Sequence, residues 1–455
     1  MTLATETPIS KRMTEEIAAR ALNAAKRAGA DAADLLLVES ADINVSQRLG
    51  KPEEMQRSEE EALGLRVFVG KKIASAVTSD FSEDALNTMA ERAVAMAKEG
   101  IDDEYADLAP SERLIREVPD LQLVDPAGEP TIEHLRELCA QAEEAALAAE
   151  GITNSEGADA GYGHSRVTLA ASNGLMQHYA GSHAGLSVCV LGGKGDKMQR
   201  DYAYSSVRYL ENLRDAGELG REAAERTLRR LNPQKVKTAS VPVVFDPRIG
   251  KRMVSSLCGA ISGASIARGT SFLKDKLGEQ IFNAAISIID DPLRIRGLGS
   301  KPFDGEGLPT ARLELVKDGV LQHWLLDIRS ANQLGLKSNA RAGRGLSSSP
   351  SPGSTNAYIP AGELTPQALM ADIASGLYVT DAFGGGANIV TGDFSLGVSG
   401  IWIENGELTH PVSEVTIAGE LLSMYQQLHA ANDLMFDSAT CVPTLRIDGM
   451  TVAGG

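Results

Sequence analysis

The segment 241–270 reads VPVVFDPRIGKRMVSSLCGAISGASIARGT and changes early from an apolar run to a helix start. Residues 241–245 are all apolar, which is typical of a buried strand. Asp246 can accept hydrogen bonds from the first free amides of a helix. Pro247 suits the first helical position, where no N–H is needed. A strand followed directly by a capped helix is therefore expected here.

That helix is expected to bury one face and to present small residues elsewhere. Apolar residues recur at spacings of three and four, namely Ile249, Met253, Leu257, Ala260, Ile261 and Ala264. Serine and glycine fill most other positions, so another backbone can approach closely. Apart from Cys258, this small-residue surface offers no acid, base or metal ligand.

Length and charge limit the classes of function. A chain of 455 residues is too long for one ordinary core, so two domains are expected, 1–233 and 234–455. A net charge of -17 repels nucleic-acid backbones and anionic membrane surfaces. No apolar run reaches the roughly 18 residues that suggest a membrane span. Neither nucleic acid nor a membrane is expected as a partner.

Cysteine usage favours a reducing compartment. Cys139, Cys189, Cys258 and Cys441 are scattered without CxxC spacing, and no secretory signal pattern precedes Thr14. A cytoplasmic location is expected. Residues 1–10 are expected to be disordered.

The N-terminal half contains one pattern twice, in the order helix, strand, hairpin and helix. The first copy is predicted at 13–28, 33–48, 61–69, 73–78 and 83–100, and the second at 131–150, 167–179, 184–191, 198–208 and 218–231. GLRVFVG at Gly64 parallels GLSVCVL at Gly185, and a Pro- and acid-rich connector spans 102–129. The two copies should continue one sheet, each covering the other's edge.

The C-terminal half is predicted to be mostly strand. Strands are expected at 285–289, 310–317, 320–326, 376–403 and 444–447, with a helix after Thr365 and a final helix at 417–430. Short strands with glycine corners favour a barrel-like sheet. The predicted fold class is α+β: duplicated units forming a mixed sheet with helices, then a mostly antiparallel, barrel-like domain with a few helices.

Searches for catalytic patterns give no self-evident constellation. His178 and His183 lie five apart with Cys189 nearby, but no glutamate follows either histidine and the spacing directs them to opposite faces of a strand. No GxSxG elbow or phosphate fingerprint occurs. The glycine corner Gly384, Gly385 and Gly386 allows close approach of a backbone, either the protein's own or that of a bound peptide. No catalytic and no metal-ligating residue is predicted.

Three long segments resemble the TldD/PmbA family, known as modulators of DNA gyrase and as subunits of a cytoplasmic zinc metalloprotease. They are FDPRIGKRMVSSLCGAISGASIARGTSFLKDKLGEQIF, FGGGANIVTGDFSLGVSGIWIENGEL and HPVSEVTIAGELLSMYQQL. The resemblance covers nearly the whole chain. In the TldD-like branch, a motif of His-Glu, three residues and then His supplies zinc ligands and a general base. A cysteine near the C-terminus is a further zinc ligand.

The resemblance implies that those three motif positions fall on Val254, Ser255 and Gly259, none of which can bind zinc through its side chain. The chain is therefore similar to the PmbA, or TldE, branch. Zinc is expected in a TldD-like partner. Cys441, a lone thiol without histidines, is not expected to form a zinc site. Unfolded peptide is expected as substrate, held by strand addition at Gly384, Gly385, Gly386, Asn388, Thr391 and Asp393.

Two alternatives remain beside this metal-free subunit. One is a regulatory protein that acts on gyrase without proteolysis, and the other is a self-sufficient hydrolase with an unrecognised site. A homodimer also remains an alternative to the heterodimer, because the surface that meets a homologous chain can meet a second copy.

Overall fold

A computed structural model describes residues 11–454. Its N-terminal half contains the predicted unit twice. The first copy is α1 (Lys11–Ala28), β1 (Ala32–Arg48), β2 (Lys51–Val69), β3 (Lys72–Thr78) and α2 (Glu83–Glu99), and the second is α3 (Ile132–Leu147), β4 (Ile152–Ala171), β5 (Met176–Gly192), β6 (Gln199–Val207) and α4 (Ala216–Arg229). Short 3₁₀ turns lie at Ser111–Arg113, Gly195–Lys197 and Leu210–Asn212. The expectation about residues 1–10 lies outside the described residues.

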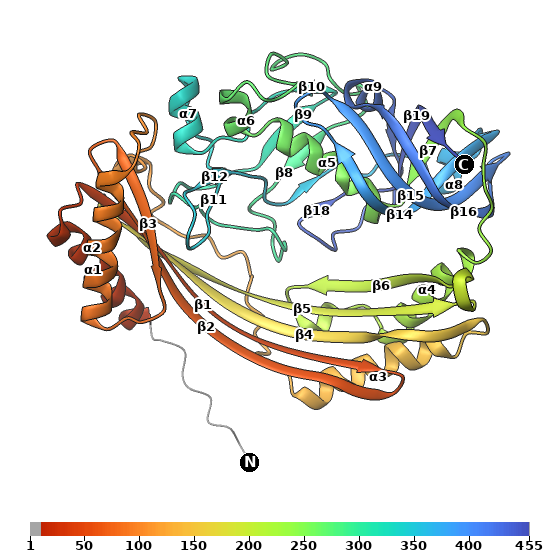
Figure 1. The fold of residues 1–455 in the computed structure, drawn as a ribbon, viewed down its shortest axis with the longest axis horizontal. Helices are drawn as coiled ribbons and strands as arrows, with labels where there is room; N and C mark the ends of the chain where they lie inside the picture. Colours follow the sequence, from red (N-terminus) through yellow and green to blue (C-terminus); the bar gives the residue numbers. More distant parts are fainter. Residues whose placement is uncertain (1–10, 455) are drawn as a thin grey trace.

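The two copies form one six-stranded sheet in the order β3-β2-β1-β4-β5-β6. β1 and β4 pair at its centre, so each copy covers an edge of the other, as predicted. Every pairing in this sheet is antiparallel rather than mixed. The helices pack in pairs on its outer face, and the sheet curves toward the C-terminal half (Figure 1).

β4 and β5 are longer than predicted, because the sequence indicated strands only at 167–179 and 184–191. Two glycines of β4 lie where neighbouring side chains leave no room for a Cβ. An added Cβ on Gly161 would stand 2.2 Å from Asn44 Oδ1, and one on Gly163 would stand 2.0 Å from Asp42 Oδ1. Glycine here therefore marks close packing on the inner face of the sheet and not a strand end.

The C-terminal half is centred on a closed barrel. Its elements are β7 (Ala239–Phe245), α5 (Pro247–Ala260), α6 (Gly263–Ala267), β8 (Ile288–Asp290), β9 (Leu313–Lys317), β10 (Val320–Leu321), α7 (Ile328–Leu334), β11 (Ala342–Gly343), β12 (Ser351–Pro352), β13 (Ala357–Tyr358), α8 (Pro366–Met370), β14 (Ser375–Ala387), β15 (Asp393–Glu404), β16 (Glu407–Glu420), α9 (Leu421–Gln426), β17 (Leu428–Ala430), β18 (Thr440–Cys441) and β19 (Leu445–Ala453). Strands β16, β15, β14, β7 and β19 follow one another, and pairing of β16 with β19 closes the ring. The predicted α+β class and barrel-like sheet are confirmed.

The predicted final helix at 417–430 is wrong. β16 continues to Glu420, α9 is only six residues long, and β17 follows. Ile417 pairs with Leu396 on one side and with Val452 on the other, and it is fully buried. The pairings that close the barrel therefore override the helical spacing of this segment. β10 is likewise only two residues long, within the predicted strand 320–326.

The two halves meet through buried charges and an apolar cluster. Asp34 of β1 binds Arg66 of β2 at 2.5 Å and Arg344 of the C-terminal half at 2.8 Å. Leu36 and Phe303, one from each half, belong to the same buried cluster. The predicted domain junction at residues 233 and 234 lies between α4 and β7.

Within residues 11–454, no helix combines the length and apolar character that crossing a bilayer requires.

Candidate functional site

Helix α5 begins as the sequence predicts. The Asp246 carboxylate accepts a hydrogen bond from the Arg248 amide at 3.0 Å, and Pro247 occupies the first turn. The apolar face is buried, but it ends earlier than expected. The helix stops at Ala260, and a separate short helix, α6, contains Ala264. The break occurs where the Gly263 amide donates to the Leu325 carbonyl at 2.8 Å.

The three positions on which the resemblance to the family places the zinc motif differ in environment. Val254 is fully buried in the main core, and the Ser255 side chain is exposed and donates to the Lys251 carbonyl at 3.1 Å. Gly259 lies beside Ile389, whose Cγ2 would make ordinary contact with an added Cβ at 3.9 Å. An isopropyl group, a hydroxyl already bonded to backbone and a glycine do not form a zinc site.

The two cysteines near α5 also lie apart from the histidines. Cys441 is 4% exposed, and its thiol donates to the Ser438 carbonyl at 3.0 Å. Burial, assisted by the charge of Asp290, raises the pKa of Cys258 to about 12. Across residues 11–454, no three His, Cys, Asp or Glu side chains gather closely enough to hold a metal ion.

His178 and His183 lie in one continuous strand, β5. Their odd spacing places them on opposite faces of the sheet. His183 Nε2 lies 3.6 Å from Asp42 Oδ1 on the inner face. The two histidines therefore cannot share a ligand, as the sequence indicated.

The glycine corner lies at the end of β14, in the hairpin with β15. Gly384, Gly385 and Gly386 have φ values of 60°, 73° and 143°, which favour glycine. Gly384 coincides with a bulge in the pairing with β15. The corner therefore uses its glycines to bend the strand, and its role in binding peptide stays a prediction.

The polar residues after the corner hold the hairpin turn itself. Asn388 donates its amide to the Asp393 carbonyl at 2.8 Å, and its Oδ1 accepts from the Val390 amide at 3.0 Å. Thr391 Oγ1 donates to Asp393 Oδ2 at 2.6 Å. These groups are thus engaged within the turn, and a substrate would meet the strand edge more readily than these side chains.

The hairpin and α5 are neighbours, which the sequence did not show. The Phe272 amide, beyond α6, donates to the Ile389 carbonyl at 3.0 Å, and the Ile389 side chain stands over Gly259. β14 pairs with β7 only from Leu377 to Val379. From residue 380 to 387 its other edge pairs with no strand among residues 11–454. An unpaired edge therefore runs close to the helix that carries the three motif positions.

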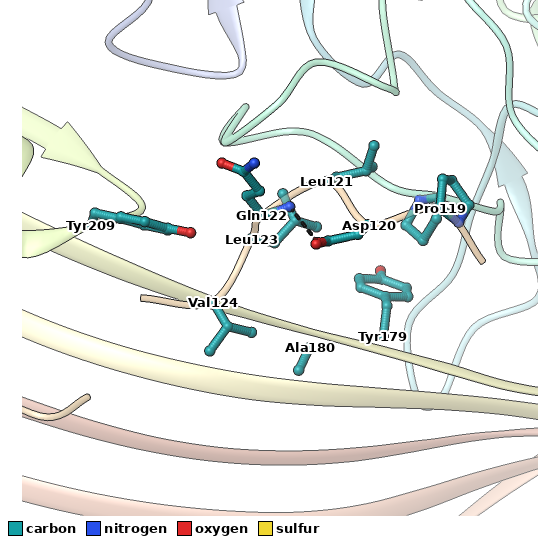
Figure 2. Close-up of a pocket in the computed structure, with 10 residues that line it drawn as sticks. Pro119, Asp120, Leu121, Gln122, Leu123, Val124, Tyr179, Ala180 and Tyr209 are labelled. Atoms are coloured by element: carbon teal, nitrogen blue, oxygen red, sulfur yellow. Dashed lines mark hydrogen bonds between the residues drawn. The ribbon is translucent and has the colours of Figure 1, made fainter. Parts of the chain in front are cut away.

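The connector between the two repeats forms a cavity of about 300 Å³ over the inner face of the sheet. Figure 2 shows Tyr179 and Tyr209 on either side of the connector segment 119–124. This segment is held at its end, where the Ser182 amide donates to the Leu123 carbonyl at 2.8 Å. The connector is thus a packed part of the wall and not a loose linker.

Comparison with known proteins agrees with this architecture. Family models described as the PmbA/TldA metallopeptidase domain 1, central domain and C-terminal domain match residues 33–97, 125–231 and 238–454. The metalloprotease PmbA of Escherichia coli O157:H7 is 35% identical over 456 residues, covering 100% of this chain and 99% of that protein.

Solved structures show the same fold. A proposed modulator of DNA gyrase from Bacteroides thetaiotaomicron aligns with a TM-score of 0.90 and 29% identity, covering 98% of this chain and 100% of the other. TldE from Thermococcus kodakarensis aligns with a TM-score of 0.85 and 22% identity, covering 96% and 100%, which establishes likeness of fold alone.

A curved antiparallel sheet facing a closed barrel defines a metalloprotease-like class of protein. The chain belongs to the PmbA/TldD metallopeptidase family.

Proposed function

We propose that this chain is the metal-free subunit of a cytoplasmic zinc metallopeptidase, and that a TldD-like partner supplies the zinc and the hydrolytic step. The observation that carries the proposal is the environment of α5. Val254 is part of the core, Ser255 bonds to its own helix and Gly259 has no side chain. The helix can support and shape a site, but its three motif positions contribute no metal ligand.

The chain would contribute by holding extended, unfolded peptide. The Thr380 carbonyl accepts from Arg248 Nη2 at 3.3 Å, but beyond it, from residue 381 to 387, one edge of β14 pairs with no strand among residues 11–454, and an extended peptide can add to such an edge through main-chain hydrogen bonds. Phe383 on this edge is 47% exposed and offers an apolar contact. Binding through main chain explains how such a chamber would accept many sequences. Leader segments of peptide-antibiotic precursors and small antitoxins are suitable substrates.

Reconstitution tests the proposal. The chain is purified alone and together with an HExxxH-containing relative from the same genome, and zinc content and cleavage of an unfolded peptide are measured. Zinc and cleavage are expected only in the mixture, with a stable complex of unlike chains. Zinc and activity in the isolated chain would support a self-sufficient hydrolase instead. Inactivity of both preparations, with binding to gyrase, would favour the regulatory function that the structural relative's description suggests.

Strand addition has its own test, made on the peptide and not on the protein. A peptide that binds the isolated chain is N-methylated at single alternate positions, which removes one main-chain donor at a time. Affinity should fall at every second position and remain unchanged between them. Side-chain replacement by alanine at the same positions is the matched control. Equal tolerance of all N-methyl groups would refute binding by strand addition.

A further inference from the structure

A cavity of about 330 Å³ lies where the edge of the N-terminal sheet meets the start of α5. Tyr204 of β6 and Glu222 of α4 line it from the N-terminal half. Lys251 of α5, Tyr378 of β14 and Asp437 line it from the C-terminal half. Met435, which is 58% exposed, lies at its rim. Both halves of the chain therefore build this cavity, and it is separate from the hairpin described above.

Most charges in the walls are already paired. Arg248, with 7% of its side chain exposed, binds Asp201 at 2.8 Å and Asp246 at 3.0 Å. Asp246 also caps α5, so the helix terminus is occupied. Arg214 and Arg226 share Glu222, at 2.7 and 2.5 Å. The pair of Arg248 with Asp201 joins the two halves, and none of these groups is available to a ligand without breaking an ion pair.

Two charges of opposite sign remain around the same tyrosine ring. Lys251 Nζ lies 5.9 Å from the centre of the Tyr204 ring, and among residues 11–454 it has no ion pair. Asp437 accepts a hydrogen bond from Tyr204 Oη to its Oδ2 at 3.1 Å, and among residues 11–454 no donor engages its Oδ1. A cation and an acceptor, each close to Tyr204, thus line one cavity.

The charges select the kind of ligand. A simple anion such as phosphate would meet four carboxylates in the walls, Glu222, Asp246, Asp433 and Asp437, and a simple cation would meet Lys251 and three arginines. A ligand that carries both signs satisfies both free groups. The volume is large enough for a compound of two amino-acid residues.

We propose that this cavity binds a short zwitterionic peptide, with Lys251 on its terminal carboxylate and Asp437 on its terminal ammonium. Binding requires neither zinc nor a partner chain, so the inference goes beyond the proposed function. If both hold, the ligand is a short product of peptide cleavage.

Calorimetry on the isolated full-length chain tests the site with alanyl-leucine as the probe. One molecule should bind per chain. The C-terminal amide and the N-acetyl form should each bind about tenfold more weakly, since each lacks one charge-assisted contact. No binding of the parent at millimolar concentration, or equal binding of either blocked form, would overturn the proposal.

Variants of Lys251 test the carboxylate end. Lys251→Met should weaken the binding of alanyl-leucine about tenfold, and this variant should bind the C-terminal amide as well as it binds alanyl-leucine itself. Lys251→Arg should retain most binding. Lys274→Met, an exposed lysine outside the cavity, is the matched control and should bind as the unaltered chain does. Equal weakening by Lys251→Met and Lys274→Met, or an amidation penalty that survives in Lys251→Met, would refute the role of Lys251. Because this assay detects neither zinc nor cleavage, its failure leaves the reconstitution result unaffected.

Discussion

Replacing Gly64 by alanine should separate the two halves of the molecule locally. An added Cβ would stand 1.9 Å from the Leu346 carbonyl oxygen, where ordinary contact begins at 3.4 Å, so the backbones must part by about 1.5 Å. Gly64 cannot retreat, because β1 and β3 pair with it on both sides, at Leu36 and Val77. The segment around Leu346 must therefore move.

The cost follows from the contacts that this movement loosens. Overpacking a well-packed site costs about 1–3 kcal/mol. Leu346 packs on the buried cluster that joins the halves, and Arg344, two residues earlier, binds Asp34 at 2.8 Å. Weakening this buried pair adds to the cost, while alanine in a strand recovers about 0.5–1 kcal/mol relative to glycine. A loss of about 2–4 kcal/mol in the free energy of local opening is expected.

Hydrogen exchange measures this opening directly. The amide of Ala342 donates to Asp304 Oδ2 in the same segment and should exchange roughly 30- to 900-fold faster in Gly64→Ala. Gly353→Ala is the control in the same region, since an added Cβ there meets nothing within 4 Å. If Ala342 exchanges at the same rate in both variants, the close approach of the two halves at Gly64 does not exist in solution.

Three other predictions concern buried acids, a thiol and Arg344. Burial, with the charges of Asp304 and Asp327, raises the pKa of Glu306, and burial raises that of Asp304 to about 6. The stability linked to the Asp304 proton is present below about pH 4 and is lost as the pH rises through 6, and that linked to Glu306 is lost in the same direction. Glu306→Gln should therefore gain thermal stability over the unaltered chain increasingly from pH 5 to 8, and a constant difference would contradict this. Burial and Glu156 raise the pKa of Cys189 to about 12, so Glu156→Gln should speed its alkylation by iodoacetamide at pH 8, and an unchanged rate, with Cys189→Ser as the blank, would exclude this role of Glu156. Arg344→Met should lower the unfolding midpoint in urea, because Asp34 loses one of two buried partners, whereas exposed Lys337→Met should not; equal midpoints would refute it.

The repeats, the capped helices and the barrel class could be predicted because they depend on local patterns. Asp246 caps α5 and Thr365 caps α8, as expected. The lengths of β4 and β5 could not be predicted, since a glycine that ends a strand and one that accommodates Asn44 look alike in sequence. The strand around Ile417 was missed because its pairing partners lie elsewhere in the chain.

The candidate site was only partly predictable for the same reason. α5 and the glycine corner were identified separately, but only the structure brings Ile389 over Gly259. Lys251, Tyr204 and Asp437 come from three distant elements, and no local spacing links them. Tyr202 and Tyr204 are two residues apart on β6, and this spacing places both aromatic rings on one face of the strand. The spacing does not indicate which residues of the C-terminal half these rings contact.

The three motif positions on α5 are not equivalent, and this difference bears on how the chain relates to a zinc-binding sister. Ser255 is exposed, so a larger polar side chain fits there at little cost, and Gly259 has room for a Cβ in ordinary contact with Ile389. Val254 is fully buried in the main core, and an imidazole there would lack hydrogen-bond partners. Restoring a zinc motif would therefore require repacking the core around residue 254 as well as changing surface residues. Residue 254 is thus committed to the packing of the barrel core.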